Sequence, residues 1–147
     1  MQDKLYKVVH KKTRKGSNWC LMAKRNLPET IDKAIKKADM QDYFPTYKKG
    51  ATIKKVPKTG GLFCFITKPE AELFIAVNKL DQMCKVIEVR PVKRVCETIT
   101  FILGAGIISN LLKLKRDKSG RIAKNVKREN RKRLHGWVTV DEVEVLT

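Results

Sequence analysis

The strongest constraint on what this chain can fold into is its charge. It carries 33 Lys and Arg against 15 Asp and Glu, a formal net charge of +18 over 147 residues. Charge of one sign opposes compaction, and chains that carry it usually meet a compensating polyanion. The apolar fraction of 42% is nevertheless that of an ordinary globular chain, so we expect one compact domain over residues 1–147.

The positive charge is concentrated in two segments. Residues 1–26 hold eight basic side chains and one acid, and residues 113–135 hold eleven basic side chains and two acids. The last twelve residues hold three acids and no base. Clustering of this kind favours a binding surface over general solubility.

Short apolar and β-branched runs alternate with two Pro-started segments. The runs predict strands at 4–12, 18–25, 52–56, 62–68, 85–95 and 137–146, and the first two strands are predicted to form a hairpin with a basic tip. The segments 27–44 and 69–84 predict helices with acidic first turns, and Leu73, Val77 and Leu80 form the predicted core stripe of the second. The expected fold is α+β, with a small twisted, mostly antiparallel sheet packed against two or three helices, plus a basic C-terminal helix.

The apolar segment 98–114 is open to three interpretations. It could be one core helix, although Gly104 and Gly106 would each cost such a helix about 1 kcal/mol relative to Ala. It could be a strand over 98–103, followed by a Gly-Ala-Gly turn and a helix. A membrane-spanning helix is disfavoured because the segment is at the short limit for spanning and contains Thr, Ser and Asn.

The predicted C-terminal helix, 121–136, would place several cations of the second basic cluster on one face. On a helix, residues spaced by three and four positions fall on one face. Four cations have this spacing: Arg121, Lys124, Arg128 and Arg131. Stacked like charges repel one another by roughly a few tenths of a kcal/mol per pair, a cost that a polyanion would remove.

Nucleic acid, either DNA or RNA, is the polyanion that this pattern suits best, because Lys and Arg bind phosphates and release counterions. The candidate contact residues are Lys11, Lys12, Arg14, Lys15, Lys24, Arg25, Lys113, Lys115, Arg116, Lys118, Arg121, Lys124, Lys127, Arg128, Arg131, Lys132 and Arg133. Trp19 and Tyr47 lie beside basic residues and are candidates for stacking on unpaired bases, with core packing as the alternative.

The chain contains no motif typical of catalysis. It lacks G-x-S-x-G, H-E-x-x-H and a Gly-rich phosphate loop, and its two histidines, His10 and His135, have basic neighbours and no acid to orient them. Its four cysteines include no C-x-x-C pair, so we expect no metal or cofactor and free thiols in a cytoplasmic compartment.

The segment 60–75, a strand followed by a Pro-started helix with an acidic first turn, resembles a unit of many small phage and prophage proteins. The small size, the high basicity and the absence of an enzyme motif fit an accessory protein of a virus or mobile element. We therefore expect a non-enzymatic nucleic-acid-binding protein. The alternatives are an inhibitor or adaptor that docks on an acidic surface of a host protein or nucleoprotein complex, and, less favoured, attachment to a membrane surface through 98–116.

Overall fold

The computed structural model describes residues 4–55, 62–92, 95–96, 98–102, 128–132 and 137–147. The helices are α1 (Ser17–Ala23), α2 (Pro28–Lys37), the 3-10 turn η1 (Gln41–Tyr43) and α3 (Lys68–Val77). The strands are β1 (Leu5–His10), β2 (Thr52–Lys54), β3 (Leu62–Phe65), β4 (Cys84–Pro91), β5 (Val95–Cys96), β6 (Thr98–Ile102), β7 (Arg128–Lys132), β8 (Trp137–Val140) and β9 (Glu142–Val145).

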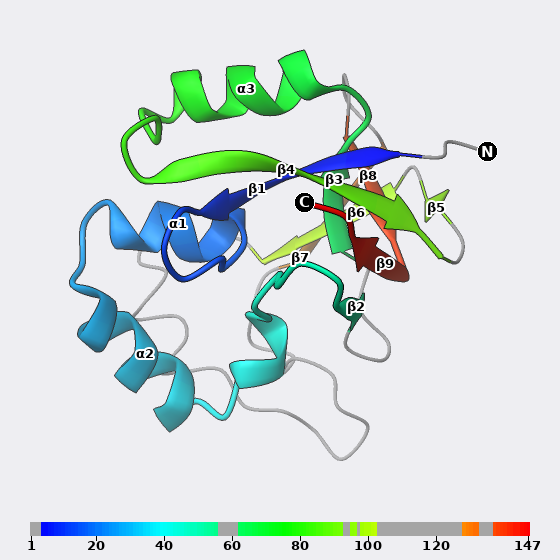
Figure 1. The fold of residues 1–147 in the computed structure, drawn as a ribbon. Helices are drawn as coiled ribbons and strands as arrows, with labels where there is room; N and C mark the ends of the chain where they lie inside the picture. Colours follow the sequence, from blue (N-terminus) through cyan, green and yellow to red (C-terminus); the bar gives the residue numbers. More distant parts are fainter. Residues whose placement is uncertain (1–3, 56–61, 93–94, 97, 103–127, 133–136) are drawn as a thin grey trace.

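The predicted α+β fold class is confirmed (Figure 1). The main sheet has seven strands in the order β2-β9-β4-β1-β3-β8-β5, and all its pairings are antiparallel. β6 and β7 form a separate antiparallel pair. The helices pack around the main sheet, with α3 on one side of it and α2 at the far side of the molecule (Figure 1).

β1 is the central strand of the main sheet. It pairs with β4 along its whole length and with β3 on its other side. Four of its six residues are buried, so its burial does not alternate as it does in a strand with one solvated face. β1 is therefore covered by other parts of the protein on both of its faces.

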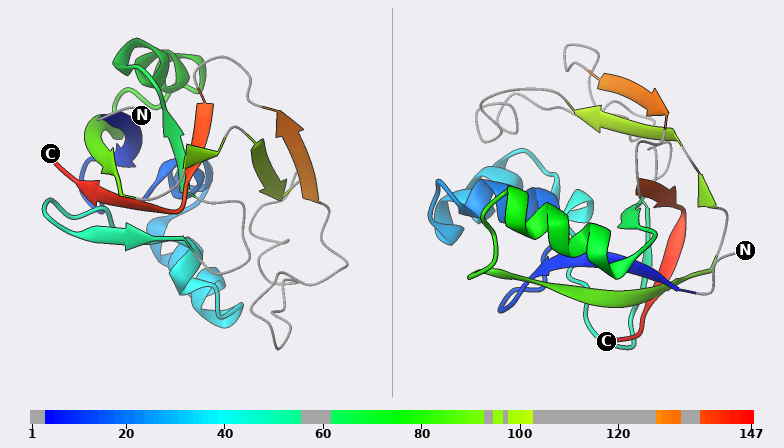
Figure 2. Two further views of the ribbon diagram at one scale, coloured as in Figure 1. Left: turned by 90° about the vertical axis from the view of Figure 1, so that its right-hand side faces the viewer. Right: turned by 90° about the horizontal axis from the view of Figure 1, so that it is seen from above.

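The main sheet is strongly curled, because β8 and β9 follow one another with only Asp141 between them. Three strands, β3, β1 and β4, separate β8 from β9 in the sheet order. In a flat sheet four steps of about 4.8 Å would place them about 19 Å apart, whereas Val140 and Glu142 are two residues apart and span at most about 7 Å. Figure 2 shows the curl from two further directions. The segment 137–146, predicted as one strand, is thus two strands that meet at a corner.

The two sides of the curled sheet carry separate apolar cores. The inner core consists of Leu5, Val9, Tyr47, Cys64, Ile87, Val89, Val138, Val140, Val143 and Val145. The outer core, beneath α3 and part of α1, consists of Val8, Cys20, Phe65, Ala71, Ile75, Leu80 and Cys84. The buried cysteines Cys20, Cys64 and Cys84 are free thiols, as predicted.

Helix α1 corrects the predicted hairpin. Residues 17–23 form a helix rather than the second strand, and it begins where the Cys20 amide donates to the carbonyl of Gly16 at 3.1 Å. The helical spacing lets Trp19 and Met22 pack against α2, while Cys20 turns toward the sheet. A third small core results, made of Trp19, Met22, Ile31, Ile35, Ala38 and Met40.

Helix α3 packs on the outer core through a different stripe from the predicted one. Ala71 and Ile75 are buried, whereas Leu73 and Val77 are 61% and 70% exposed. The helix ends at Val77, and Lys79 adopts a left-handed conformation with φ of 55° that turns the chain. Leu80 is fully buried as predicted, but it lies beyond the helix, so it does not extend a stripe through Leu73 and Val77.

Strands β6 and β7 show how part of the C-terminal region folds. Residues 98–102 form a strand, as the strand-turn-helix interpretation of 98–114 requires, and 103–114 lies outside the described residues. The predicted helix over 121–136 is wrong at 128–132, which pair with β6 in the register Thr98 opposite Lys132 to Ile102 opposite Arg128. The rest of that predicted helix lies outside the described residues.

Replacement of the N-cap of α3 should destabilise the fold. The Thr67 hydroxyl accepts a hydrogen bond from the Glu70 amide at 3.4 Å and donates to its carboxylate oxygen Oε1 at 2.7 Å. We expect Thr67→Ala to lower the free energy of unfolding by about 1 kcal/mol in urea. Thr30→Ala, at an exposed position within α2, is the matched control and should change it by less than about 0.5 kcal/mol. Equal effects of the two substitutions would contradict a capping role.

Candidate nucleic-acid interface

The first basic cluster lies in a tight turn between β1 and α1 that an antiparallel bridge between Val9 and Gly16 closes, and α1 replaces the second strand of the predicted hairpin. The loop starts after His10, whose Nδ1 accepts hydrogen bonds from the backbone amides of Lys12 and Thr13 at 3.2 and 3.1 Å. Burial and the Lys12 charge lower the pKa of His10, which favours the neutral ring that these two bonds need. His10 therefore shapes the loop that carries the cations.

Arg14 works as an internal clamp. Its Nε donates to the carbonyl of Tyr47 at 2.7 Å and its Nη2 to the main-chain oxygen of Thr147 at 2.8 Å. Its backbone is left-handed, with φ of 56°, a conformation that costs a side-chain-bearing residue about 1 kcal/mol. Its guanidinium group thus joins the loop to two segments far away in sequence.

Lys11 and Lys15 are also held by carbonyl oxygens. Lys15 Nζ donates to the carbonyl of Phe44 at 2.8 Å, and Lys11 Nζ donates to that of Asp81 at 3.1 Å. A cation held in this way can still attract an anion, but moving to a phosphate would cost it the internal bond. Of the four cations predicted in this loop, Lys12 is thus the exposed one whose ammonium makes no internal hydrogen bond in the structure as described.

A second group of exposed cations belongs to α2 and to the segments around it. Lys24 and Arg25, both predicted, follow α1 and are exposed. Five further exposed lysines were missed: Lys33, Lys36, Lys37, Lys48 and Lys49. The signal for the first three was present in the sequence, because they lie off the apolar stripe of the predicted helix.

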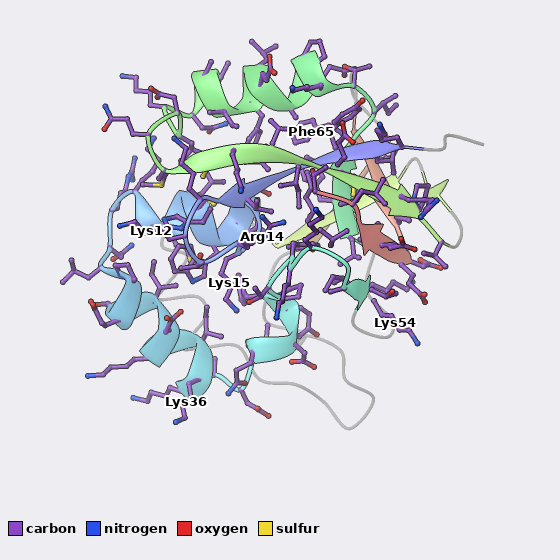
Figure 3. All side chains as sticks on the ribbon, viewed as in Figure 1. Lys12, Arg14, Lys15, Lys36, Lys54 and Phe65 are labelled. Carbon is purple, nitrogen blue, oxygen red and sulfur yellow. The ribbon has the colours of Figure 1, made fainter. Side chains whose placement is uncertain are left out.

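We call this set of exposed cations the α2 basic surface: Lys12, Lys24, Arg25, Lys33, Lys36, Lys37, Lys48 and Lys49. The elements that carry it lie together on the side of the molecule away from α3, and Figure 3 labels Lys12 and Lys36 on this side. The contacts between these elements include the hydrogen bond from Trp19 Nε1 to Asp32 Oδ1 at 3.2 Å and an antiparallel backbone bridge between Lys15 and Thr46.

The α2 basic surface has an excess of positive charge. Residues 11–49 contain eleven Lys and Arg and four acids. Within the described ranges, ion pairs join Lys4 to Glu88, Lys55 to Asp141 and Arg90 to Glu144, and no member of the α2 basic surface takes part in them. Its charge is therefore available to an anion.

Both aromatic residues predicted to stack on bases are buried. Trp19 is 1% exposed and packs edge-on against His10 with ring centroids 5.1 Å apart. Tyr47 is 3% exposed and belongs to the inner core. Neither ring presents a face to a base, and core packing accounts for both.

Tyr47 instead covers a buried cation. Lys7 is 4% exposed; its Nζ donates to the carbonyl of Phe63 at 2.6 Å and lies 4.5 Å from the centre of the Tyr47 ring. Burial lowers the pKa of Lys7, but the neighbouring Tyr47 and Cys64 groups raise it above its ordinary value. Burial raises the pKa of Tyr47, and Lys7 offsets part of that effect. No signal in the sequence pointed to this pair, because the buried face of the strand that carries Lys7 depends on the rest of the fold.

The second basic cluster is described only in part. Arg128, Arg131 and Lys132 lie on β7, where the helical interval of three between Arg128 and Arg131 no longer defines one face. The four-cation stripe predicted for 121–136 is therefore corrected. The remaining candidates lie outside the described residues: Lys113, Lys115, Arg116, Lys118, Arg121, Lys124, Lys127 and Arg133.

The described ranges contain no group of three or more His, Cys, Asp or Glu side chains that could hold a metal ion. Within the same ranges, no helix is both long and apolar enough to cross a membrane. Searches of family models, curated proteins and solved structures found no match to the chain.

Removal of the Arg14 clamp should reduce stability. Arg14→Ala loses two hydrogen bonds from a charged donor and keeps the strained backbone, so we expect it to lower the free energy of unfolding by about 2 kcal/mol in urea. Arg14→Gly removes the backbone strain, so its loss of unfolding free energy should be smaller, about 1 kcal/mol. Lys12→Ala is the matched control from the same loop and should change stability by less than about 0.5 kcal/mol. A loss as large for Lys12→Ala as for Arg14→Ala would show that Arg14 is not a clamp.

Stability should also fall at alkaline pH. Because burial raises the pKa of Tyr47, the unfolded chain loses this proton at a lower pH than the folded chain. The stabilisation that arises from this difference in the pKa of Tyr47 is fully present below about pH 10, and it is lost as pH rises through the pKa of the folded state. Denaturant unfolding from about pH 8 to about pH 11 should show this fall, and Tyr47→Phe should flatten it above about pH 10. Parallel curves for the two proteins would rule out Tyr47 as its source.

Proposed function

We propose that this protein binds nucleic acid, DNA or RNA, through phosphate contacts made by the α2 basic surface together with the basic segment 113–133. The observation that carries the proposal is the segregation of charge. The α2 basic surface lies outside the three ion pairs of the described structure, while acids accumulate in the last strands. Cations that are exposed and unneutralised favour a polyanion partner over a purely structural role.

The buried aromatic rings narrow the expected mode of binding. With Trp19 and Tyr47 in the cores, these two rings cannot contribute base stacking. Phosphate contacts position a protein on nucleic acid without reading its sequence. The proposal is accordingly one of binding with weak sequence preference and strong dependence on salt.

The salt dependence of affinity tests the proposal. The logarithm of the binding constant for duplex DNA should fall linearly with the logarithm of salt concentration, with a slope of roughly −0.9 per phosphate neutralised. The triple variant Lys12→Ala/Lys36→Ala/Lys37→Ala should reduce the magnitude of this slope by about 2 to 3. Fluorescence anisotropy with labelled DNA and RNA of matched length, between about 50 and about 300 mM salt, measures both quantities.

Lys54→Ala is the matched control, because Lys54 is exposed on β2, away from α2 (Figure 3). This variant should leave the slope within about 0.5 of the wild-type value. Weak binding of both nucleic acids even at about 50 mM salt would overturn the proposal and favour an acidic protein partner. An equal loss for Lys54→Ala and the triple variant would overturn the assignment to the α2 basic surface.

A further inference from the structure

The outward side of α3 is apolar along one edge. Leu73 and Val77 are 61% and 70% exposed, and Pro69 and Ala76 beside them are exposed as well. Pro69, Leu73 and Val77 succeed one another at intervals of four, so they form one row along the helix. Two large apolar side chains in one row are unusual on the surface of so highly charged a chain.

Lys68 and Glu72 form the other edge of the same surface, and two more exposed charged residues follow the end of the helix. Lys68 and Glu72 are one turn apart at the N-terminal end of α3, and Lys79 and Asp81 follow its C-terminal end. All four are exposed, and none takes part in the ion pairs among the residues that the structure describes. From Lys68 to Asp81, the four charges therefore follow the order positive, negative, positive, negative.

This arrangement is self-complementary under a two-fold axis. When two copies of a helix pack antiparallel about such an axis, each edge meets the same edge of the other copy in the reverse direction. If the axis passes beside Ile75, Leu73 of one copy lies opposite Val77 of the other. Glu72 then comes near Lys79 of the other copy, and Lys68 near its Asp81. Ala76, a small residue between the two edges, lets the helices approach closely.

We propose that a second copy of this chain docks on α3 in this antiparallel arrangement. The overall charge supports α3 as the contact, because two copies with a net charge of +18 repel one another through most other surfaces. Residues 69–78 contain two acids and no base. Helix α2 lies at the far end of the molecule from α3 (Figure 1), so its lysines stay exposed in both copies.

The contact is small, which sets the strength to expect. A ten-residue helix is about 15 Å long. An interface of this length is at the low end of the size range, so we expect a dissociation constant of about 10 to about 100 µM. Added salt should strengthen the dimer by screening the net repulsion, which is opposite in sign to its effect on nucleic-acid binding.

Sedimentation equilibrium of the purified protein, from about 5 to about 300 µM, tests the proposal without nucleic acid. The variant Leu73→Gln/Val77→Gln changes two exposed positions, so it should fold normally by circular dichroism and weaken the dimer at least about tenfold. Leu27→Gln, at an equally exposed apolar position (68%) next to α2, is the matched control and should leave the dimer unchanged.

A charge exchange tests the orientation of the two helices. Glu72→Lys and Lys79→Glu should each weaken the dimer, and the double variant should restore it, because the pair reforms between copies with its signs reversed. Failure of the double variant to restore the dimer overturns the antiparallel arrangement. A monomer throughout the concentration range, or a dimer that Leu27→Gln weakens as much as the α3 variant does, overturns the docking surface. None of these outcomes bears on nucleic-acid affinity, which is measured separately.

Discussion

The corner at Asp141 is the constraint on which the rest of this structure depends. A single residue joins two strands that three other strands separate in the sheet, so the sheet has to curl. The curl creates an inner side filled mainly by valine and other apolar side chains, and an outer side on which α3 and α1 pack. β1 passes through the middle and is covered on both sides. Lys7 is buried for this reason, and it holds its charge with the help of a carbonyl and an aromatic ring rather than a carboxylate.

The sequence predicted which segments form helices and strands better than it predicted which of these elements pack together. Pro-started segments with acidic first turns do begin α2 and α3, and the apolar runs at 62–68 and 85–95 do contain strands. The errors arose where tertiary contacts outweigh local preference. Trp19 and Met22 make α1 a helix because they are buried against α2, and β6 draws the polar segment 128–132 into a strand. The buried side of α3 passes through Ala71 and Ile75, where the helix packs on the sheet, and the predicted stripe through Leu73 and Val77 is exposed.

The same distinction applies to the basic residues. Their number and clustering were visible in the sequence, but the division between internal donors and exposed cations was not. Lys7, Lys11, Arg14 and Lys15 all donate to main-chain carbonyls of distant segments. These four side chains join the first 26 residues to segments far away in the sequence. Much of the exposed positive charge lies on and around α2, a segment whose sequence pattern had indicated chiefly an apolar helix face.

The third core, formed between α1 and α2, has a consequence for how the molecule moves. It is separate from the two cores of the sheet and is joined to them through α1 and a few polar bonds such as that of Lys15 to Phe44. The amides of α2 should therefore exchange with solvent through a local opening that leaves β1 and β4 closed. A polyanion held by the lysines of α2 would oppose that opening, so the part of the fold with the most exposed positive charge is also the part whose opening depends most on what is bound.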